Sequence, residues 1–184
     1  QPLCPGTYLI TVTKNGCSQV YTYYVGNSSY TSVQLIHDLN PTTAGTVGQL
    51  LNPSSATNPI VVTGSFNVPF LQSLLLTNHY IVLDPSATMT VVGTLRLEGC
   101  TVEFTNEQHQ VDIADKSGDL TLTNFNKKSS LFTPGDCGHT WAGVRNWHNF
   151  RILEGSTIEH ARIAVQAMDA HTLIRARGAN FENN

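Results

Sequence analysis

From residue 58 onward, short apolar and polar stretches alternate along the chain, and turn residues separate them. Val, Ile, Leu, Thr and Phe fill the stretches, whereas Gly, Asn, Asp, Pro and Ser gather between them. The stretches are PIVVTGSFNV, HYIVLDPSATMTVVG, TLRLEGCTVEF, VDIADKSGDLTLTNF, FRILEGSTIEHARIAV and TLIRARGANFEN. No long stripe with the helical period of about 3.6 residues interrupts them. The pattern predicts an all-β fold of many short strands.

One eight-residue phrase recurs in this region, as LEGCTVEF at 97–104, LEGSTIEH at 153–160 and, more weakly, ARGANFEN at 176–183. Alignment on Leu97, Leu122, Leu153 and Ala176 gives spacings of 25, 31 and 23 residues, which suit one solenoid coil per repeat. A β-hairpin array would need tight turns such as Asn-Gly at each reversal, and the repeat region has no Asn-Gly. A βαβ array would need a helix in every unit, and the pattern predicts none. We therefore predict a parallel β-helix over 59–184, with about five coils.

The repeated phrase also predicts which side chains point inward, because alternate residues of a strand face opposite sides. We expect Leu97, Val102 and Phe104 to point inward, with Gly99 at a corner. Ile158 then repeats Val102, and Phe181 repeats either Val102 or Phe104. We expect four residues of the first copy to point into solvent: Arg96, Glu98, Thr101 and Glu103. The long interval between Leu122 and Leu153 predicts an extruded loop over 127–140.

The first 58 residues divide into two parts. Residues 1–25 read as a β-hairpin, because TYLITVT and CSQVYTYYV both alternate and KNG joins them. Residues 26–58 form a polar connector that we expect to cap the solenoid. Within it, YTSVQLIHDLN fits either a short helix, with Val33, Ile36 and Leu39 on one face, or an ordinary strand.

Composition narrows the classes of partner and compartment. The net charge is -3, so the chain as a whole gives no electrostatic reason to bind nucleic acid or an anionic membrane. No apolar run approaches the roughly 18 residues of a membrane helix, and no signal peptide is visible at the start. An even number of cysteines in such a chain favours disulfides and an oxidising compartment. We expect Cys4 to pair with Cys17 and Cys100 with Cys137, although the sequence alone permits other pairings.

Two resemblances to known families rest on short motifs. Cys4, Gly6-Thr7-Tyr8, Thr11-Val12-Thr13 and Gly16-Cys17 resemble the end of the immunoglobulin-like repeats of large Bacteroidota surface adhesins. From about residue 58, the chain looks like right-handed β-helix proteins secreted by Bacteroidota. That second resemblance rests on DPSATMTVVGTLRLEG, on Cys137 with Trp141, Gly143 and Val144, and on STIEHARIAV. It implies a right-handed coil and an extracellular, multidomain surface protein, often exported by the type IX route, and it assigns no catalytic residue.

Enzymatic β-helices place clustered Asp residues beside a base, so Asp112, Asp115 and Asp119 with Lys116 are the nearest candidates. Their spacing suits an exposed turn, which is the usual location of Asp, and we assign no catalytic residue. His139, His148 and His160 with Glu154 or Glu159, or His160 stacked on His171, could form a metal site only by chance spacing. We therefore predict neither a metal nor a cofactor.

The segment GHTWAGVRNWHNF offers ligand-binding candidates, namely Trp141, Arg145, Trp147 and His148. Flat exposed aromatic rings suit sugars or partner surfaces. The competing interpretation is that Trp141 and Val144 fill the interior while Trp147 covers a loop. Five arginines could also form a cationic stripe, unless Glu154, Glu159 and Glu182 neutralise it: Arg145, Arg151, Arg162, Arg175 and Arg177.

These observations favour a non-catalytic segment of a long cell-surface protein. Its solenoid would contact glycans, neighbouring copies or other parts of the same polypeptide. Two alternatives stay open. One is a stretch of an extracellular filament or stalk, and the other is part of a polysaccharide lyase or glycoside hydrolase.

Overall fold

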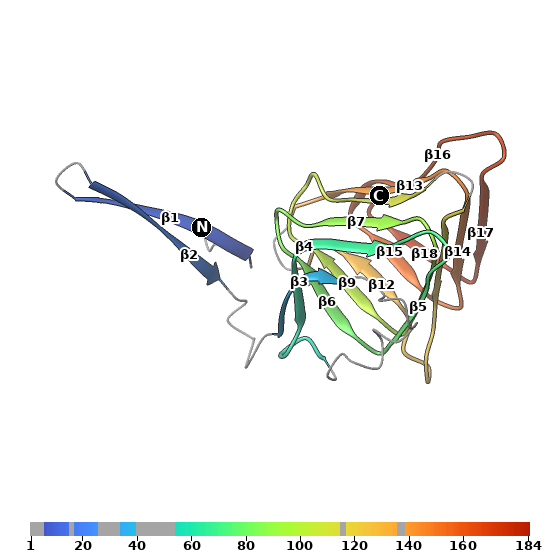
Figure 1. Ribbon diagram of the computed structural model, residues 1–184. Coiled ribbons are helices and arrows are strands. Elements are labelled where there is room, and N and C mark those ends of the chain that lie inside the picture. Colours follow the sequence, from blue (N-terminus) through green and yellow to red (C-terminus); the bar gives the residue numbers. More distant parts are fainter. Residues whose placement is uncertain (1–5, 15–16, 26–33, 40–53, 115–116, 136–138) are drawn as a thin grey trace.

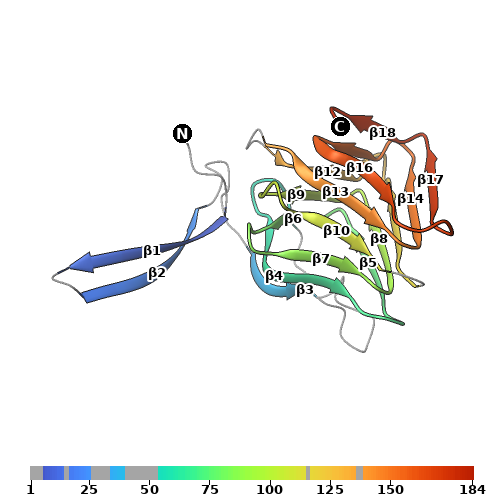
Figure 2. The same ribbon diagram turned by 90° about the horizontal axis from the view of Figure 1, so that it is seen from above.

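The computed structural model describes residues 6–14, 17–25, 34–39, 54–114, 117–135 and 139–184. Within these ranges every regular element is a strand. Two strands form an N-terminal hairpin, β1 (Gly6–Lys14) and β2 (Cys17–Val25). They pair antiparallel from Gly6↔Val25 to Lys14↔Cys17, which confirms the predicted hairpin. Figures 1 and 2 show it projecting to one side of the remaining strands.

The other strands belong to a parallel β-solenoid of about five coils, as predicted (Figure 1). Its first five-stranded ladder, which we call face A, consists of β5 (Ser73–Thr77), β8 (Thr94–Glu98), β11 (Asp119–Thr123), β14 (Asn149–Leu153) and β17 (Leu173–Arg177).

A second ladder, face B, consists of β6 (Tyr80–Leu83), β9 (Thr101–Phe104), β12 (Leu131–Thr133), β15 (Thr157–Glu159) and β18 (Asn180–Glu182). A third, face C, consists of β7 (Thr88–Val91), β10 (Gln110–Ile113), β13 (Trp141–Asn146) and β16 (Ala161–Ala167). The long strand β4 (Ile60–Val68) starts both of these faces, because its first half pairs with β6 and its second half with β7.

The segment for which the sequence allowed a helix or a strand is a strand. β3 (Gln34–Leu39) pairs in parallel with β4, and Leu39 is buried in the core. Ile36 and Leu39 both face inward although they are three residues apart, because the strand register shifts between Ile36 and Asp38. The helical alternative is therefore wrong. Val33 lies outside the described residues.

Inward side chains stack in columns that pass through successive coils. On face A, one column is Leu76, Leu97, Leu122, Ile152 and Ala176. On face B, the matching column is Ile81, Val102, Phe132, Ile158 and Phe181. Burial of such aliphatic and aromatic columns is the main favourable term for the fold, at roughly 25 cal/mol per Å² of apolar surface. The second column confirms that Ile158 repeats Val102 and settles Phe181 at the same position.

One residue of the predicted alignment is wrong. Leu122 pairs with Ile152, and Leu153 pairs with Arg177 instead. The corner before β15 has two consecutive residues with positive φ, Glu154 at 53° and Gly155 at 76°, whereas the first copy bends at Gly99 alone, with φ 62°. The second corner therefore holds one more residue. The phrase aligns after the corner and is offset by one before it.

Two side chains that we expected in solvent are buried. Glu103 is 2% exposed and Thr101 is 8% exposed. The Tyr80 hydroxyl donates a hydrogen bond to Glu103 Oε2 over 2.7 Å. The chain at Gly135 also packs directly on the Glu103 side chain, because a Cβ there would lie 2.5 Å from Glu103 Cδ. The prediction failed because the outer side of face B is itself covered.

The expected extruded loop over 127–140 is also wrong in its middle. Leu131–Thr133 is strand β12, it pairs with β9 and β15, and Phe132 is fully buried. The extra length of this coil lies at its corners, one of which is a turn closed by bridges between Phe125 and Lys128.

The cysteine prediction fails at Cys100, which is a free, buried thiol. Its Sγ donates to the Leu76 carbonyl at 3.3 Å inside the corner. Burial raises the pKa of this thiol. The predicted partner Cys137 and also Cys4 lie outside the described residues, so the Cys4–Cys17 pair stays a prediction.

A β-bulge at Gly143 yields the first testable prediction. The register of β13 against β16 shifts between Gly143 and Val144, which accommodates one extra residue in β16. Gly143 has φ 107°, and a Cβ there would lie 1.7 Å from the Ile163 carbonyl oxygen. We expect Gly143→Ala to lower the free energy of unfolding by about 3 kcal/mol or more, through strain and overlap together.

Gly178→Ala is the matched control. Gly178 also has positive φ, at 61°, yet the nearest atom to an added Cβ is 3.8 Å away. Only the backbone preference is lost, at about 1 kcal/mol. Urea unfolding of both variants checks the difference, and equal losses would show that the bulge does not need glycine.

Candidate functional site

The ligand candidate Trp141 lies in the core and does not reach solvent. Its ring is fully buried and stacks on Phe104, with centroids 4.0 Å apart and planes 6° from parallel. Its indole N–H donates to the Glu159 carbonyl over 2.9 Å. The interpretation that Trp141 and Val144 fill the interior is therefore correct, and Trp141 is withdrawn as a ligand-binding residue.

Arg145 faces outward on face C, where it is paired with an acid. Its Nε lies 3.3 Å from Asp112 Oδ1, without the alignment of a hydrogen bond, so the contact is an ion pair. The Gln110 amide also donates to Asp112 Oδ1, over 2.8 Å. The Arg145–Asp112 contact joins neighbouring coils, whereas the Gln110 contact lies within β10.

The two enzyme candidates that the structure describes, Asp112 and Asp119, lie on different faces. Asp119 faces outward on face A, where Arg151 binds its two oxygens at 3.1 and 3.0 Å. Asp112 lies on face C, on the other side of a corner. Asp115 and Lys116 lie outside the described residues. Each of these two carboxylates forms an ion pair with an arginine of the next coil.

The histidines that we considered for a metal site are also separate. His139 Nε2 donates to the Phe104 carbonyl at 3.0 Å, His148 Nδ1 to the Gly118 carbonyl at 3.1 Å, and His171 contacts Asp169 at 3.0 Å. Among the residues that the structure describes, no group of three His, Cys, Asp or Glu side chains could hold a metal ion.

The five arginines of the predicted stripe divide between two faces. Arg151, Arg175 and Arg177 point outward on face A, whereas Arg145 and Arg162 belong to face C. The acids expected to neutralise them, Glu154, Glu159 and Glu182, take part in no ion pair within the described part of the chain. Asp112 and Asp119 do so instead.

Trp147 and His148 lie where each coil turns from face C to face A. We call this line of corners the corner edge. Backbone bonds continue across it, because Val92 N–H donates to Val68 O, Ala114 to Val91, Trp147 to Ile113 and Met168 to Asn146. Trp147 therefore occupies the same place in its coil that Val92 occupies two coils earlier. It is half-buried.

The first described corner of this edge carries two additional residues. Val68 pairs with Val91, and Ser73 pairs with Thr94. Four residues, 69–72, therefore oppose the two residues Val92 and Gly93. Phe70 and Leu71 have no counterpart in the next coil and are pushed outward, so that Phe70 is 60% exposed and Leu71 is 82% exposed.

This corner is built tightly. The Gln72 backbone N–H donates to the Pro69 carbonyl over 3.1 Å. Leu71 has φ 62°, which is unusual for a bulky residue. Gly93 lies directly against the turn, because a Cβ there would be 2.3 Å from both the Pro69 and the Gln72 carbonyl oxygens. The absence of a side chain at Gly93 lets the turn approach this closely.

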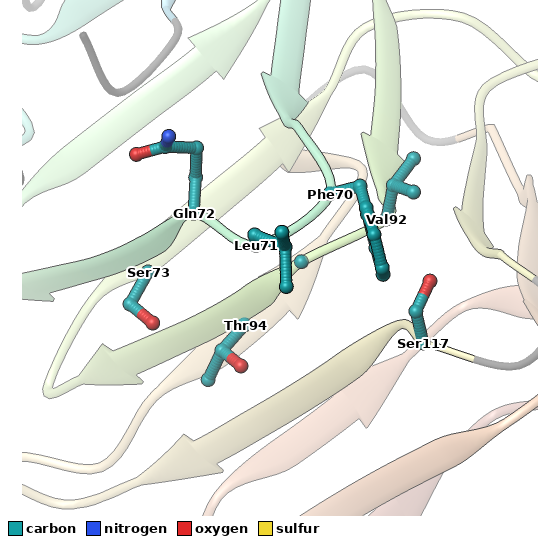
Figure 3. A pocket seen from close by; sticks show the side chains of 8 residues that line it. Phe70, Leu71, Gln72, Ser73, Val92, Thr94 and Ser117 are labelled. Atoms are coloured by element: carbon teal, nitrogen blue, oxygen red, sulfur yellow. The ribbon is translucent and has the colours of Figure 1, made fainter. Parts of the chain in front are cut away.

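A pocket of about 220 Å³ lies beside the turn. In Figure 3, Phe70 and Leu71 project from the turn to the side on which Thr94 and Ser117 lie. Apolar side chains line it together with uncharged polar ones, namely Phe70, Leu71, Val92, Gln72, Ser73, Thr94 and Ser117. The pocket thus combines an exposed aromatic ring with hydroxyl and amide groups.

Sequence reasoning missed this turn, although a signal was present. In NVPFLQS, two large apolar residues directly follow a proline between two strands, where turns usually hold Gly, Asn, Asp or Ser. The predicted strand stretch PIVVTGSFNV ends at Val68, and the apolar turn that follows it was not assigned.

Two buried histidines are held in the neutral form. His109 is 5% exposed. Its Nε2 donates to the Asp84 backbone carbonyl over 3.0 Å, and its Nδ1 accepts from the Asn106 backbone N–H over 3.3 Å. Burial lowers the pKa of His109 to about 4. Burial, with the nearby Lys128 charge, also lowers the pKa of His79.

Comparison with known proteins does not assign the chain to a family. It matches no family model, no curated protein and no solved structure. Within the described residues, no helix is long and apolar enough to span a membrane.

The two tryptophans should respond oppositely to truncation. Trp141→Ala removes the ring stacked on Phe104 and leaves a cavity, so we expect the free energy of unfolding to fall by about 3–5 kcal/mol. Trp147→Ala removes a half-buried surface ring and should cost about 1 kcal/mol or less. Chemical denaturation of both variants measures this, and a larger loss for Trp147→Ala would contradict the assignment.

The neutral His109 should make the fold acid-sensitive. Its folded pKa of about 4 lies below the ordinary histidine value of 6.5, so the unfolded chain binds the proton more tightly. The stabilisation is complete above pH 6.5 and is lost as the pH falls from 6.5 towards 4. We expect about 2 kcal/mol to be lost from this group between pH 8 and pH 5.

The measurement is urea unfolding at both pH values. His109→Gln, which keeps a donor for the Asp84 carbonyl, should lose about 2 kcal/mol less than the parent on acidification. His171→Gln is the control, since His171 is exposed, and it should keep the parent's pH dependence. Unchanged acid sensitivity in His109→Gln would contradict the prediction.

Proposed function

We propose that this chain is a non-catalytic adhesive segment of an extracellular surface protein, and that it binds carbohydrate along the corner edge. The observation that carries the proposal is the exposed Phe70–Leu71 turn beside its polar pocket. We also propose that the solenoid coils are right-handed. The resemblance to secreted Bacteroidota β-helix proteins supports that winding and the extracellular location.

The turn has no evident structural reason to be apolar. A solenoid corner needs only two residues here, as Val92 and Gly93 show in the next coil. The two extra residues leave large apolar side chains in water, and Leu71 adopts a backbone conformation that is unfavourable by about 1–3 kcal/mol. Strain and exposed apolar surface at one place are more typical of a contact site than of a stabilising feature.

The chemistry of the pocket suits an uncharged sugar. The face of the Phe70 ring can pack against the C–H groups of a pyranose. Gln72, Ser73, Thr94 and Ser117 supply amide and hydroxyl groups to its hydroxyls. The lining residues that the structure describes carry no charge, which suits an uncharged ligand.

The corner edge extends this site along the solenoid. Trp147 lies three coils beyond Pro69 in the same backbone ladder, which is about 14 Å at the usual spacing of paired strands. Phe70 follows Pro69, so two aromatic residues lie about three rungs apart on a stiff support, which suits an extended ligand rather than a single small molecule. Rigid presentation also limits the entropy lost on binding.

The hydrolase and lyase alternatives receive no support from the described carboxylates. Asp112 and Asp119 lie on different faces, and each is bound by arginine. A general acid must reach the glycosidic oxygen opposite a second carboxylate, and these two do not face one common site.

The test is binding to immobilised neutral oligosaccharides by the parent and three alanine variants. Phe70→Ala should weaken binding at least tenfold, and Trp147→Ala several-fold, because ring contacts of this kind contribute about 1–2 kcal/mol. Phe125→Ala is the matched control, since Phe125 is 37% exposed at a different corner, and it should bind normally.

Thermal unfolding of the same variants separates loss of contact from loss of fold, since Phe70 is largely exposed and its removal should change stability little. Absence of binding to any neutral oligosaccharide, or equal weakening by Phe125→Ala, would overturn the proposal.

A further inference from the structure

Basic residues gather on the outer side of face A. Its strands contain Arg96, Arg151, Arg175 and Arg177 but only Glu98 and Asp119 as acids. Four positive and two negative charges leave the face at +2, whereas the whole chain carries -3. The face therefore has a charge opposite to that of the molecule.

The first two arginines are neutralised within the protein. Arg96 Nε donates to Glu98 Oε1 over 2.6 Å. Arg151 binds both oxygens of Asp119. Both acids are thereby used, and the excess charge is left in the last coil, on β17.

Arg175 and Arg177 have no acidic partner in the part of the chain that the structure describes. No carboxylate of the described residues lies within ion-pairing distance of either guanidinium, and both side chains are exposed. Arg175 also pairs in register with Arg151. Like charges directly opposite on neighbouring strands are unfavourable, so an anion between them would lower the electrostatic energy of the folded chain.

The spacing of these three arginines fits a ligand with several anionic groups. Arg151 and Arg175 are one rung apart, about 4.8 Å, and Arg175 and Arg177 are two residues apart along one strand, about 6.6 Å. Guanidinium groups bind carboxylate and sulfate oxygens in a bidentate manner. Leu173 points outward beside them and is 43% exposed, which adds an apolar contact.

We propose that Arg175 and Arg177, beside the Asp119-bound Arg151, form a binding site for an anionic polysaccharide that carries carboxylate or sulfate groups. Two features favour this ligand over a nucleic acid. No aromatic side chain points outward from the described strands of face A for base stacking. Asp119 and Glu98 lie on the same face and would repel a continuous phosphate backbone, whereas anionic sugars can place their charges at intervals. This site is separate from the corner edge and takes a different class of ligand.

The experiment measures binding of the whole chain to heparin and to polygalacturonate, with neutral dextran and duplex DNA as comparison probes. Arg175→Gln should weaken binding to the anionic polysaccharide about tenfold, and Arg175→Gln/Arg177→Gln should abolish it. Arg162→Gln is the matched control. It removes the same charge from an exposed strand residue of face C and should change the affinity less than twofold.

Every outcome bears on the proposal. Equal weakening by Arg162→Gln would reduce the effect to net charge and overturn the site. No binding to either anionic polysaccharide, or tighter binding to DNA that is lost in Arg175→Gln, would also overturn it. Phe70→Ala should leave this binding intact, so the site can fail or succeed independently of the proposed function. Circular dichroism and thermal unfolding confirm that each variant is folded.

Discussion

The parallel backbone ladder between successive coils is the constraint on which the rest of this molecule depends. Each strand bonds to its counterpart in the coil before and the coil after, so a residue's position in one coil fixes what it stacks on. Inward positions become columns such as Leu74, Leu95, Leu120 and Phe150. A slip of one residue would turn a whole column outward. Extra residues are therefore accommodated either at the corners or at bulges within the ladder, such as the one opposite Gly143.

Much of the fold could be predicted because the columns leave a mark in the sequence. Val102 and Ile158 share a position in two copies of one phrase, and the structure places Phe132 between them. The same logic failed at Leu153, because Glu154 and Gly155 add one residue to a corner and corner length leaves no periodic signal. It failed at Glu103 because burial of the outer side depends on Tyr80 and on the chain near Gly135. Those contacts come from outside the repeated phrase.

The candidate sites were less predictable than the fold. Trp141 and Trp147 stand six residues apart, yet one stacks in the core and the other lies on the corner edge. Alternation assigns the side of a strand but not where a strand ends. The Phe70–Leu71 turn was missed for a related reason, because only the opposing coil shows that these two residues have no counterpart. The division of the arginines between faces A and C also required the register.

The two proposed sites arise from this one constraint in opposite ways. The Phe70–Leu71 turn exists where four residues of one coil oppose two of the next, since the two inserted residues must leave the wall and take their apolar side chains with them. The arginine site exists where the ladder is unbroken, since in-register pairing that stacks Ile152 on Ala176 also stacks Arg151 on Arg175. Stacking of apolar side chains is favourable, but stacking of like charges is not. Among the described residues, Asp119 offsets the charge of Arg151, whereas no carboxylate pairs with Arg175. Screening by salt weakens ionic contacts at the arginine site and leaves apolar contacts at the corner edge nearly unchanged. The two surfaces therefore differ in physical character as well as in position.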